Sequence, residues 1–459
     1  RRESREQLIS GAAVSAIYRT CTQATSRPRS KPVSAKPILI LTSGTEMRDN
    51  VIIIGGGASG LCAAISLKKL EPSLSVRVLE ALPRVGKKLA ATGNGRCNII
   101  NKKILPERYH GRHPEFCVYA LGKYDNAVCE KFFSEIGVPF VYEGDKGYPA
   151  SLQAASVVDC LRFAAEELGV TVCTETKVTN IQVMGGGYKV IAGNMSFQAE
   201  NVIAAAGLLS GGDKLGNDGS VLKILKNAGF KTAAMHPAIV QLKTETDVVK
   251  QLKGIKVDAM VRLLKGKETV REEYGEVLFC DYGLSGPPIL QISGAADGQC
   301  NMSVVLDLMP EKSADILVKE LENRAMALKN RMLDEFFTGM LNKRLGQVIV
   351  KLAGRKLNEK TADLSASDVK KLAGLIKAMT FTVTGNTGFI NSQVTAGGLD
   401  TDGFDEKTMM SRENKGLYAI GEILDIDGDC GGFNLRWAWS SAMCAAENIV
   451  KRNKNAAGK

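Results

Sequence analysis

From about residue 50 onward, the hydrophobic positions alternate between short continuous apolar runs and longer segments with helical spacing. Such short runs are typical of strands buried in a parallel sheet, and strands that alternate with helices predict an α/β fold. The first run, Val51–Ile54, precedes a predicted helix from Gly60 to about Leu70 and a second run at Val76–Leu79. Further strands are predicted at residues 170–173, 177–183, 188–191 and 197–205.

Three glycines, Gly55, Gly57 and Gly60, follow the first predicted strand with the spacing Gly-x-Gly-x-x-Gly. The first permits a tight turn, the second lets the backbone approach a pyrophosphate, and the third lets the helix pack closely on the strand. The positive end of that helix would face the phosphates. The second strand ends in Glu80, which could accept hydrogen bonds from ribose hydroxyls. This order of elements predicts a dinucleotide site.

Residues 232–379 have a different pattern, with β-type runs first and helical spacing at 314–328 and 367–377. The α/β pattern resumes near Phe381 and ends with a predicted strand at 416–420 and a helix at about 435–450. We therefore predict a domain inserted into a discontinuous nucleotide-binding domain. The predicted segments are a disordered or non-native extension (1–46), the first part of the nucleotide-binding domain (47–231), the inserted substrate domain (232–379) and the second part of the nucleotide-binding domain (380–459).

The chain has 459 residues and a formal net charge of +11. Residues 1–46 contain eight basic and three acidic residues, so +6 remains on the rest of the chain. This excess is weak support for nucleic-acid binding, because an anionic cofactor or substrate explains it equally well. We therefore predict a small-molecule substrate and no nucleic-acid partner. The first 46 residues superficially resemble an organellar transit peptide, but we favour an extension upstream of Met47.

The eleven cysteines show no Cys-x-x-Cys spacing, which speaks against a disulfide reductase and suits a reducing cytoplasm. No metal site is predicted, because the three histidines have no suitably spaced thiols or carboxylates beside them. The longest uncharged apolar run, residues 51–67, contains the glycine-rich turn. We interpret it as a strand and a helix, and we predict no membrane insertion.

Two segments outside the glycine motif carry further candidate contacts. Gly421 and Glu422 follow a predicted strand, and in flavoproteins of this architecture such an acid can hold a ribityl hydroxyl while the glycine admits the pyrophosphate. The helix after residues 425–434 could direct its N-terminus at the flavin edge where negative charge accumulates on reduction. Because only one dinucleotide motif is present, FAD is expected to occupy it, and NADH or NADPH would bind only transiently.

The loop at residues 93–98 combines small residues with a guanidinium and an amide. Arg96 could bind a phosphate or polarise the flavin, and Asn98 could hydrogen-bond the ring. Cys97 is expected to be a packed side chain rather than a nucleophile. For Lys88, a phosphate contact and a solvated position are both open.

These motifs resemble the BaiN-like family of FAD-dependent oxidoreductases, over a region from about Met47 to the C-terminus. The resemblance implies a Rossmann-like FAD-binding domain, a β-rich inserted domain and a small helical subdomain. Family members have been described as bile-acid 3-oxo-Δ4,6 ene-reductases or as aminoacetone oxidases. The motifs that carry the resemblance are Ile53–Gly60, Gly86–Leu89, Thr92–Asn98, His236–Ala238, Gly283–Pro287, Val394–Gly398, Gly421–Asp425 and Gly431–Ala438.

We therefore predict an FAD-dependent ene-reductase that acts on a conjugated 3-oxo steroid, with hydride delivered from reduced flavin. A flavin amine oxidase that releases hydrogen peroxide is the alternative, and a non-catalytic flavoprotein linked to RNA is a remote one. Candidates for a hydrogen-bond or proton donor are Tyr148, Tyr282 and Asn434. The candidate cofactor-binding residues are Gly55, Gly57, Ala58, Ser59, Gly60, Glu80, Lys88, Gly95, Arg96, Cys97, Asn98, Val178, Gly421, Glu422, Asn434 and Leu435.

Overall fold

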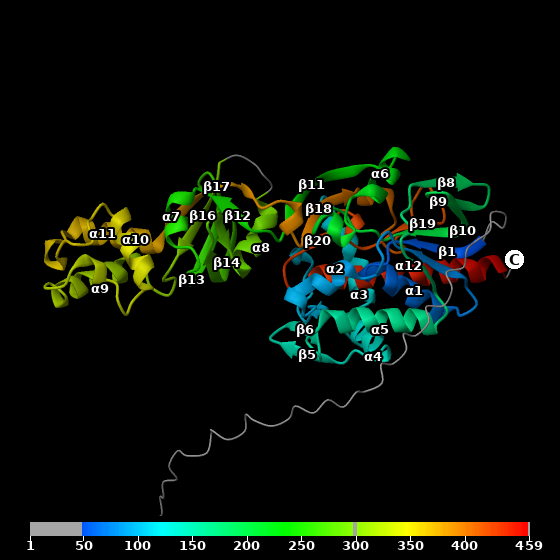
Figure 1. Ribbon diagram of the computed structural model, residues 1–459, viewed down its shortest axis with the longest axis horizontal. Helices are drawn as coiled ribbons and strands as arrows, with labels where there is room; N and C mark the ends of the chain where they lie inside the picture. The colour runs from blue at the N-terminus through cyan, green and yellow to red at the C-terminus, as the bar shows by residue number, and fades with distance from the viewer. Residues whose placement is uncertain (1–47, 297–300, 458–459) are drawn as a thin grey trace, which may run out of the picture. The chain divides into compact units, whose positions relative to one another are not determined.

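The apolar run Val51–Ile54 lies buried in the middle of the main sheet, as its composition predicts. Figure 1 shows the computed structural model, which describes residues 48–296 and 301–457. The predicted extension at residues 1–46 lies outside the described residues. The strand order is β7-β2-β1-β10-β9-β8, and β19 also pairs with β10. These strands are β1 (Arg48–Ile54), β2 (Val76–Leu79), β7 (Thr171–Cys173), β8 (Asn180–Met184), β9 (Gly187–Ala192), β10 (Met195–Ala204) and β19 (Leu417–Ala419).

Parallel pairing joins β7, β2, β1, β10 and β19, so the carboxyl ends of these strands meet at one edge of the sheet. This arrangement confirms the predicted α/β class. Two helices from opposite ends of the chain, α1 (Ala58–Leu70) and α12 (Phe433–Ala457), pack against each other. Arg436 on α12 is fully buried and donates to the Leu121 carbonyl at 3.0 Å and to Asn126 Oδ1 at 3.1 Å. Arg436 thereby fixes α12 against the segment at residues 121–126.

Smaller elements surround this sheet. A three-stranded sheet has the order β3-β6-β5, and β4 pairs with β20. These elements are α2 (Lys87–Ala91), β3 (Ile100–Asn101), β4 (Tyr109–His110), α3 (Val118–Lys123), α4 (Asn126–Glu135), β5 (Phe140–Glu143), β6 (Lys146–Pro149), α5 (Ala154–Glu167), α6 (Ser220–Asn227) and β20 (Asp427–Gly428).

The inserted segment forms a closed barrel with the strand order β12-β15-β14-β13-β16-β17. The barrel has its own core, in which Val261, Leu263 and Phe279 are completely buried. Its last strand crosses the boundary predicted at residue 380, so the inserted segment extends to Asn386 and the α/β pattern resumes later than expected. The strands are β12 (Leu242–Thr244), β13 (Lys256–Lys265), β14 (Glu268–Phe279), β15 (Gly283–Ser285), β16 (Met302–Asp307) and β17 (Met379–Asn386).

Between β16 and β17 the chain forms a helical subdomain. A separate two-stranded sheet pairs β11, which precedes the barrel in the sequence, with β18, which follows it. Ser365 and Asp368 form a capping box at the start of α11, which stabilises that helix end. Among the described residues, none of the helices has both the length and the apolar character needed to cross a membrane. The remaining elements are β11 (Thr232–Ala238), α7 (Thr246–Gln251), α8 (Pro287–Ile292), α9 (Ala314–Ala327), α10 (Lys343–Leu352), α11 (Ala366–Lys377) and β18 (Val394–Leu399).

Candidate active site

A cleft of about 440 Å³ opens at the carboxyl ends of β1, β2 and β10. This is the edge of an open α/β sheet where ligands bind. Of the predicted site residues, those that line the cleft are Gly55, Gly57, Ala58, Ser59, Glu80, Lys88, Arg96, Asn98, Tyr148, Val178, Glu422, Asn434 and Leu435.

The glycine turn has the geometry that the motif predicts. Gly55 has φ +107°, and a Cβ atom there would lie 2.6 Å from the Ala205 carbonyl oxygen. A Cβ atom on Gly60 would lie 1.9 Å from the Gly55 carbonyl oxygen, so this glycine permits the close approach of α1 to the turn. In contrast, a Cβ atom on Gly57 would have no protein atom within 4 Å. The space beside Gly57 is therefore open on the cleft side.

Glu80 is held in the cleft wall by two backbone donors. Its Oε2 accepts from the Gly56 amide at 2.9 Å, and its Oε1 accepts from the Leu82 amide at 2.8 Å. Each carboxylate oxygen has more than one lone pair, so the group can still accept from a ligand hydroxyl. The role of Glu80 toward a ribose stays a prediction.

Lys88 and Glu422 contact each other across the cleft wall. Lys88 pairs with Glu422 Oε2 and donates to Ser210 Oγ at 2.6 Å. Glu422 Oε1 accepts from Ser210 Oγ at 2.7 Å and from the Thr395 amide at 2.8 Å. The side chain of Lys88 is therefore paired although it is 25% exposed, and its positive charge is partly compensated by Glu422.

Arg96 and Tyr148 form a second polar group on the cleft. The guanidinium of Arg96 lies 4.5 Å from the centroid of the Tyr148 ring and pairs with Glu143. Burial raises the pKa of Tyr148, although the charge of Arg96 acts to lower it. Because its pKa is raised, the Tyr148 hydroxyl is protonated at neutral pH. Among the described residues, none hydrogen-bonds to this hydroxyl, so it is available to a ligand.

Asn98 and its neighbour Cys97 have different environments. The Oδ1 atom of Asn98 is buried and has no hydrogen-bond partner among the described residues, and Asn98 is one of the residues that line the cleft. A buried acceptor of this kind is uncommon in proteins and points to a donor on a bound group. Cys97 is completely buried, and burial raises its pKa to about 12, which excludes a reactive thiolate at neutral pH.

Several predicted residues do not have the expected position. Tyr282 lies on the barrel, in the loop before β15, and is not among the residues that line the cleft, so its role as a donor to the substrate stays a prediction. Asn434 does line it, but its amide group bonds to the backbone of Gly428 on both sides, at 2.8 and 2.6 Å. This amide shapes the turn before α12, and its role as a donor to the substrate stays a prediction. The predicted cofactor-binding residues that are not among those lining the cleft are Gly60, Gly95, Cys97 and Gly421.

The residues present fit FAD. Neither α1 nor α12 has an acidic residue in its first turn, so two positive helix ends are available to an anionic group. The gap at Gly57 leaves room for a pyrophosphate close to the backbone. The unpartnered Asn98 Oδ1 can accept from an N–H group of the flavin ring.

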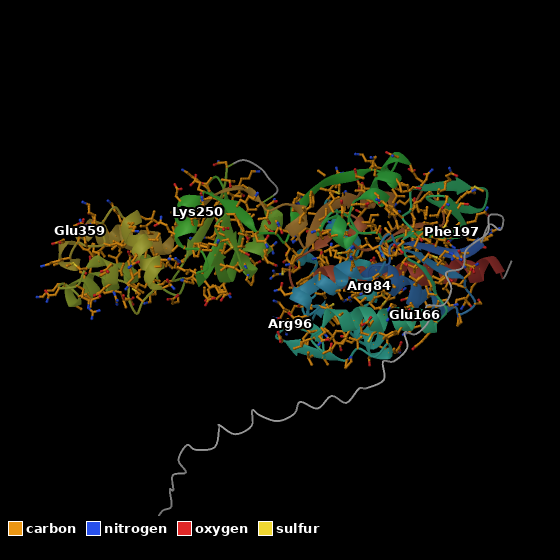
Figure 2. All side chains as sticks on the ribbon, in the orientation of Figure 1. Arg84, Arg96, Glu166, Phe197, Lys250 and Glu359 are labelled. Atoms are coloured by element: carbon orange, nitrogen blue, oxygen red, sulfur yellow. The ribbon has the colours of Figure 1, made fainter. Side chains whose placement is uncertain are left out.

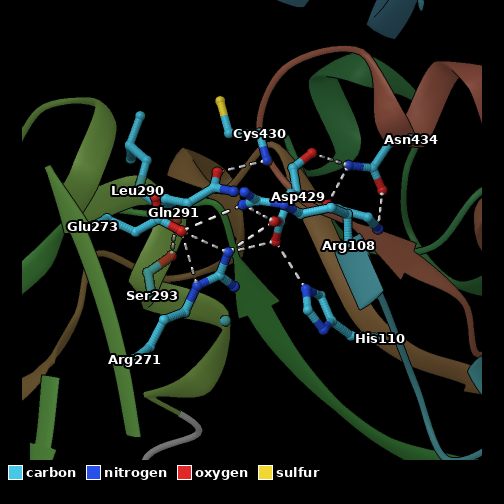
Figure 3. A network of polar contacts seen from close by, with 12 residues as sticks. Arg108, His110, Arg271, Glu273, Leu290, Gln291, Ser293, Asp429, Cys430 and Asn434 are labelled. Atoms are coloured by element: carbon cyan, nitrogen blue, oxygen red, sulfur yellow. Dashed lines mark hydrogen bonds and ion pairs between the residues drawn. The ribbon is translucent and has the colours of Figure 1, made fainter. Parts of the chain in front are cut away.

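A network around Asp429 was not predicted (Figure 3). Asp429 accepts from His110 Nε2 at 2.8 Å and from Arg271 at 2.8 Å, and Arg108 donates to it at 3.0 Å. Burial acts to raise the pKa of Asp429, but these donors outweigh it and hold the pKa below its usual value. Because Arg271 comes from β14, this network joins the barrel to the cleft wall.

Asp429 and Cys430 both line the cleft, and the Cys430 amide donates to Gln291 Oε1 of α8 at 2.8 Å. Sequence spacing could not reveal these contacts, because the partners lie far apart in the chain.

His113, Asp400 and Asp402 also have side-chain ligand atoms within 4.8 Å of one another, but Asp400 is paired with Arg112 at 2.9 Å. The predicted absence of a metal stays a prediction.

Comparison with known proteins identifies the family. The sequence profile described as HI0933-like protein Rossmann domain matches residues 49–448. The chain belongs to this family. It is 34% identical over 405 residues to a 3-dehydro-bile acid delta(4,6)-reductase of Clostridium scindens, covering 87% of this chain and 98% of that protein. It is 31% identical over 408 residues to a ribosomal RNA dihydrouridine synthase of Haemophilus influenzae, with the same coverage of 87% and 98%.

Among solved structures, a 3-ketosteroid-delta4-(5alpha)-dehydrogenase from Rhodococcus jostii RHA1 matches with a TM-score of 0.46 and 15% identity. The match covers 89% of this chain and 98% of that chain. Membership of the HI0933-like family confirms the expected resemblance to BaiN-type flavoproteins and the predicted Rossmann-like FAD-binding fold. The protein is an FAD-dependent oxidoreductase.

Proposed function

We propose that this enzyme reduces a carbon–carbon double bond conjugated to a carbonyl group, with a 3-oxo-Δ4,6 steroid as the first candidate substrate. The observation that carries this proposal is the 34% identity, over 98% of its length, with a protein named as a reductase of a bile acid at these positions. The cleft supports it, because apolar side chains of Pro287, Leu290 and Val394 line the same space as Tyr148. A flat apolar ligand with one polar end suits such a lining.

When bound, the reduced flavin supplies a hydride to the electrophilic carbon of the conjugated system. The task of the protein is then to stabilise the negative charge that develops on the carbonyl oxygen. The protonated Tyr148 hydroxyl can donate a hydrogen bond to that oxygen, and Arg96 supplies positive charge beside the same ring. A well-placed donor of this kind contributes roughly 3–4 kcal/mol to transition-state stabilisation. A proton from solvent then adds to the enolate carbon and completes the reduction.

A second candidate substrate is the uracil ring of uridine in ribosomal RNA. Relatives from Haemophilus influenzae and Escherichia coli, 31% and 28% identical, are named as ribosomal RNA dihydrouridine synthases. The double bond of uracil is conjugated to a ring carbonyl, so the same reaction and the same donor at Tyr148 apply.

An anaerobic reoxidation experiment tests the proposal. Photoreduced enzyme is mixed with a 3-oxo-Δ4,6 steroid or with protein-free ribosomal RNA, and flavin absorbance is followed. Enzyme with oxidised flavin is mixed separately with aminoacetone, because an amine substrate would reduce the flavin. We expect reoxidation by the steroid together with a reduced steroid product. Reoxidation by RNA alone transfers the proposal to the second candidate. Hydrogen peroxide release with aminoacetone in air, without either reduction, would indicate the amine oxidase instead.

Two tyrosine variants provide a matched comparison. Tyr148→Phe removes the hydroxyl that lines the cleft, and we expect roughly 100-fold slower reoxidation because one charge-stabilising donor is lost. Tyr282→Phe makes the same change on the barrel, outside the cleft, and we expect reoxidation at the original rate. Equal rates in both variants would rule out Tyr148 as the donor.

We further propose NADH or NADPH as a transient electron donor, because the chain carries a single dinucleotide motif. Anaerobic titration with each nucleotide tests this, and bleaching of the flavin absorbance is the expected result.

We expect a cytoplasmic enzyme, because the cysteines have no disulfide or metal spacing.

A further inference from the structure

The helical subdomain accounts for most of the net positive charge outside the first 46 residues. Residues 309–378 contain 14 basic and nine acidic residues, so this region has a net charge of +5. The whole chain beyond residue 46 has +6. Within the subdomain, residues 336–358 contain five basic residues and no acidic residue. The charge is therefore concentrated on one short stretch that includes α10.

Helix α10 presents this charge on one side. Leu345, Val348 and Ile349 are buried in the subdomain, which leaves the opposite side exposed. Lys343, Arg344 and Lys351 lie on this exposed side, and Lys356 follows it. We call these four side chains the α10 basic face. None of the four forms an ion pair with another side chain in the part of the chain that the structure describes.

The basic face continues toward the barrel. A shallow depression of about 420 Å³ lies beside it and is lined by Ile255, Asn342, Lys343, Arg344 and Gln347, without an acidic side chain. The Arg344 guanidinium donates to the Lys253 carbonyl at 3.4 Å, which joins α10 to the loop after α7. Helix α7 packs on α10 and carries the exposed Lys250, labelled in Figure 2.

We propose that the α10 basic face is a docking surface for RNA. Four cations without an acidic partner on one short stretch of chain repel one another, and a chain of phosphates neutralises them with release of counterions. The four residues of the α10 basic face do not line the cleft, so a small substrate bound in the cleft does not contact them. A substrate as large as RNA can extend from the cleft to this face. The inference rests on the uridine form of the proposed function and identifies the part of the molecule that binds the RNA.

The test compares two triple variants with equal loss of charge. Lys343→Gln/Lys351→Gln/Lys356→Gln removes three charges from the basic face and leaves the Arg344 contact to Lys253 in place. Lys319→Gln/Lys329→Gln/Arg331→Gln removes three exposed charges from α9 and the turn after it, where acidic residues are interspersed. Binding of protein-free ribosomal RNA and of labelled oligouridylate is measured with the full chain over a range of salt concentrations.

For the α10 variant, we expect weaker RNA binding and a slope of log K against log salt that is smaller by about 2, because each lost phosphate contact removes roughly 0.7. The α9 variant is expected to retain most of the original affinity and slope. Equal losses in the two variants would overturn the proposal, as would RNA binding that neither variant changes. Binding to anionic lipid vesicles but not to RNA would also overturn it.

Steroid-driven flavin reoxidation, measured on the same proteins, separates this inference from the proposed function. If the α10 variant loses RNA binding but reacts normally with the steroid, the docking surface is supported independently of the steroid reaction. If wild-type protein reduces neither substrate yet binds RNA through α10, the docking surface stands and the reductase proposal fails. If wild-type protein does not bind RNA, the docking surface is refuted whatever the steroid result.

Discussion

Arg271 on β14 donates to both carboxylate oxygens of Asp429, at 2.8 Å each, and so fastens the inserted barrel to the wall of the cofactor cleft. The side chain of Asp429 is only 1% exposed, and that of Arg271 is 18% exposed. Asp429 immediately precedes Cys430 and the glycines that lead into α12. The position of the barrel is thereby coupled to the backbone at one end of the cleft.

Replacing Arg271 with Gln is expected to weaken this coupling. Asp429 would keep Arg108 and His110 as donors but lose the arginine that bonds to both of its oxygens, at a cost of about 1–3 kcal/mol in the free energy of unfolding. We expect a raised KM for substrate with unchanged FAD affinity, because Arg271 does not line the cleft. Urea unfolding and flavin titration measure the two effects. Lys267→Gln, in the turn before β14, is the control, and an equal effect there would contradict the role of Arg271.

The three glycines of the motif allow cofactor binding to be separated from folding. Gly57 has φ −83°, and a Cβ atom there would have no protein atom within 4 Å, so Gly57→Ala leaves the free energy of unfolding of the cofactor-free protein within about 0.5 kcal/mol. The methyl group would occupy the space needed by the pyrophosphate. We expect a colourless protein with a normal melting temperature. Normal flavin content in Gly57→Ala would place the pyrophosphate elsewhere.

Gly60→Ala should behave differently. A Cβ atom there would lie 1.9 Å from the Gly55 carbonyl oxygen, so α1 must move away from the turn. We expect a loss of roughly 1–3 kcal/mol in the free energy of unfolding together with loss of flavin. Thermal unfolding of the cofactor-free forms of the two alanine variants, side by side, provides the comparison.

Asn98→Ala tests the unpartnered acceptor in the cleft. The Oδ1 atom of Asn98 is buried without a donor among the described residues, so its removal should not destabilise the cofactor-free protein. In the holoenzyme the same change removes a hydrogen bond, and we expect the Kd for FAD to rise roughly tenfold. Fluorescence titration measures this value. A variant that is destabilised without FAD but binds it normally would indicate that Asn98 serves the fold.

The parts of the site that are formed by residues close together in the sequence could be predicted from the sequence. Gly55, Gly60 and Glu80 lie within one βαβ unit, where strand and helix periodicity determine which residues meet. Cys97 was correctly expected to be a packed side chain, because nothing beside it in the loop would activate a thiol. The geometry of the turn at Gly55 and Gly60 is the one that the motif requires.

Contacts between distant segments could not be predicted in this way. His110 and Arg271 reach Asp429 from 319 and 158 positions away, and only the fold brings them together. Tyr282 was assigned to the site as a possible donor, although no local pattern indicates which end of a barrel strand faces the cleft. For Asn434 a local signal did exist, because Asn beside a helix start commonly bonds to nearby backbone.

Asp427 provides a test that depends on pH. Burial raises its pKa from 3.8 to about 6, although His110 and His236 act to lower it. Because the pKa of the folded state is the higher one, the folded protein binds more protons between pH 3.8 and about 6. The contribution of Asp427 to stability therefore falls as the pH rises through this interval. Above pH 6 the buried charge destabilises the fold.

Asp427→Asn removes that charge. We expect the variant to be more stable than the original protein at pH 7.5, by about 1–2 kcal/mol, with no difference near pH 4, where Asp427 is protonated when folded. Urea unfolding at a series of pH values measures this difference. Asp402→Asn, at an exposed carboxylate, is the control and should show no such dependence. A difference for Asp427→Asn that is constant from pH 4 to 7.5 would show that lost packing, and not ionisation, governs the effect.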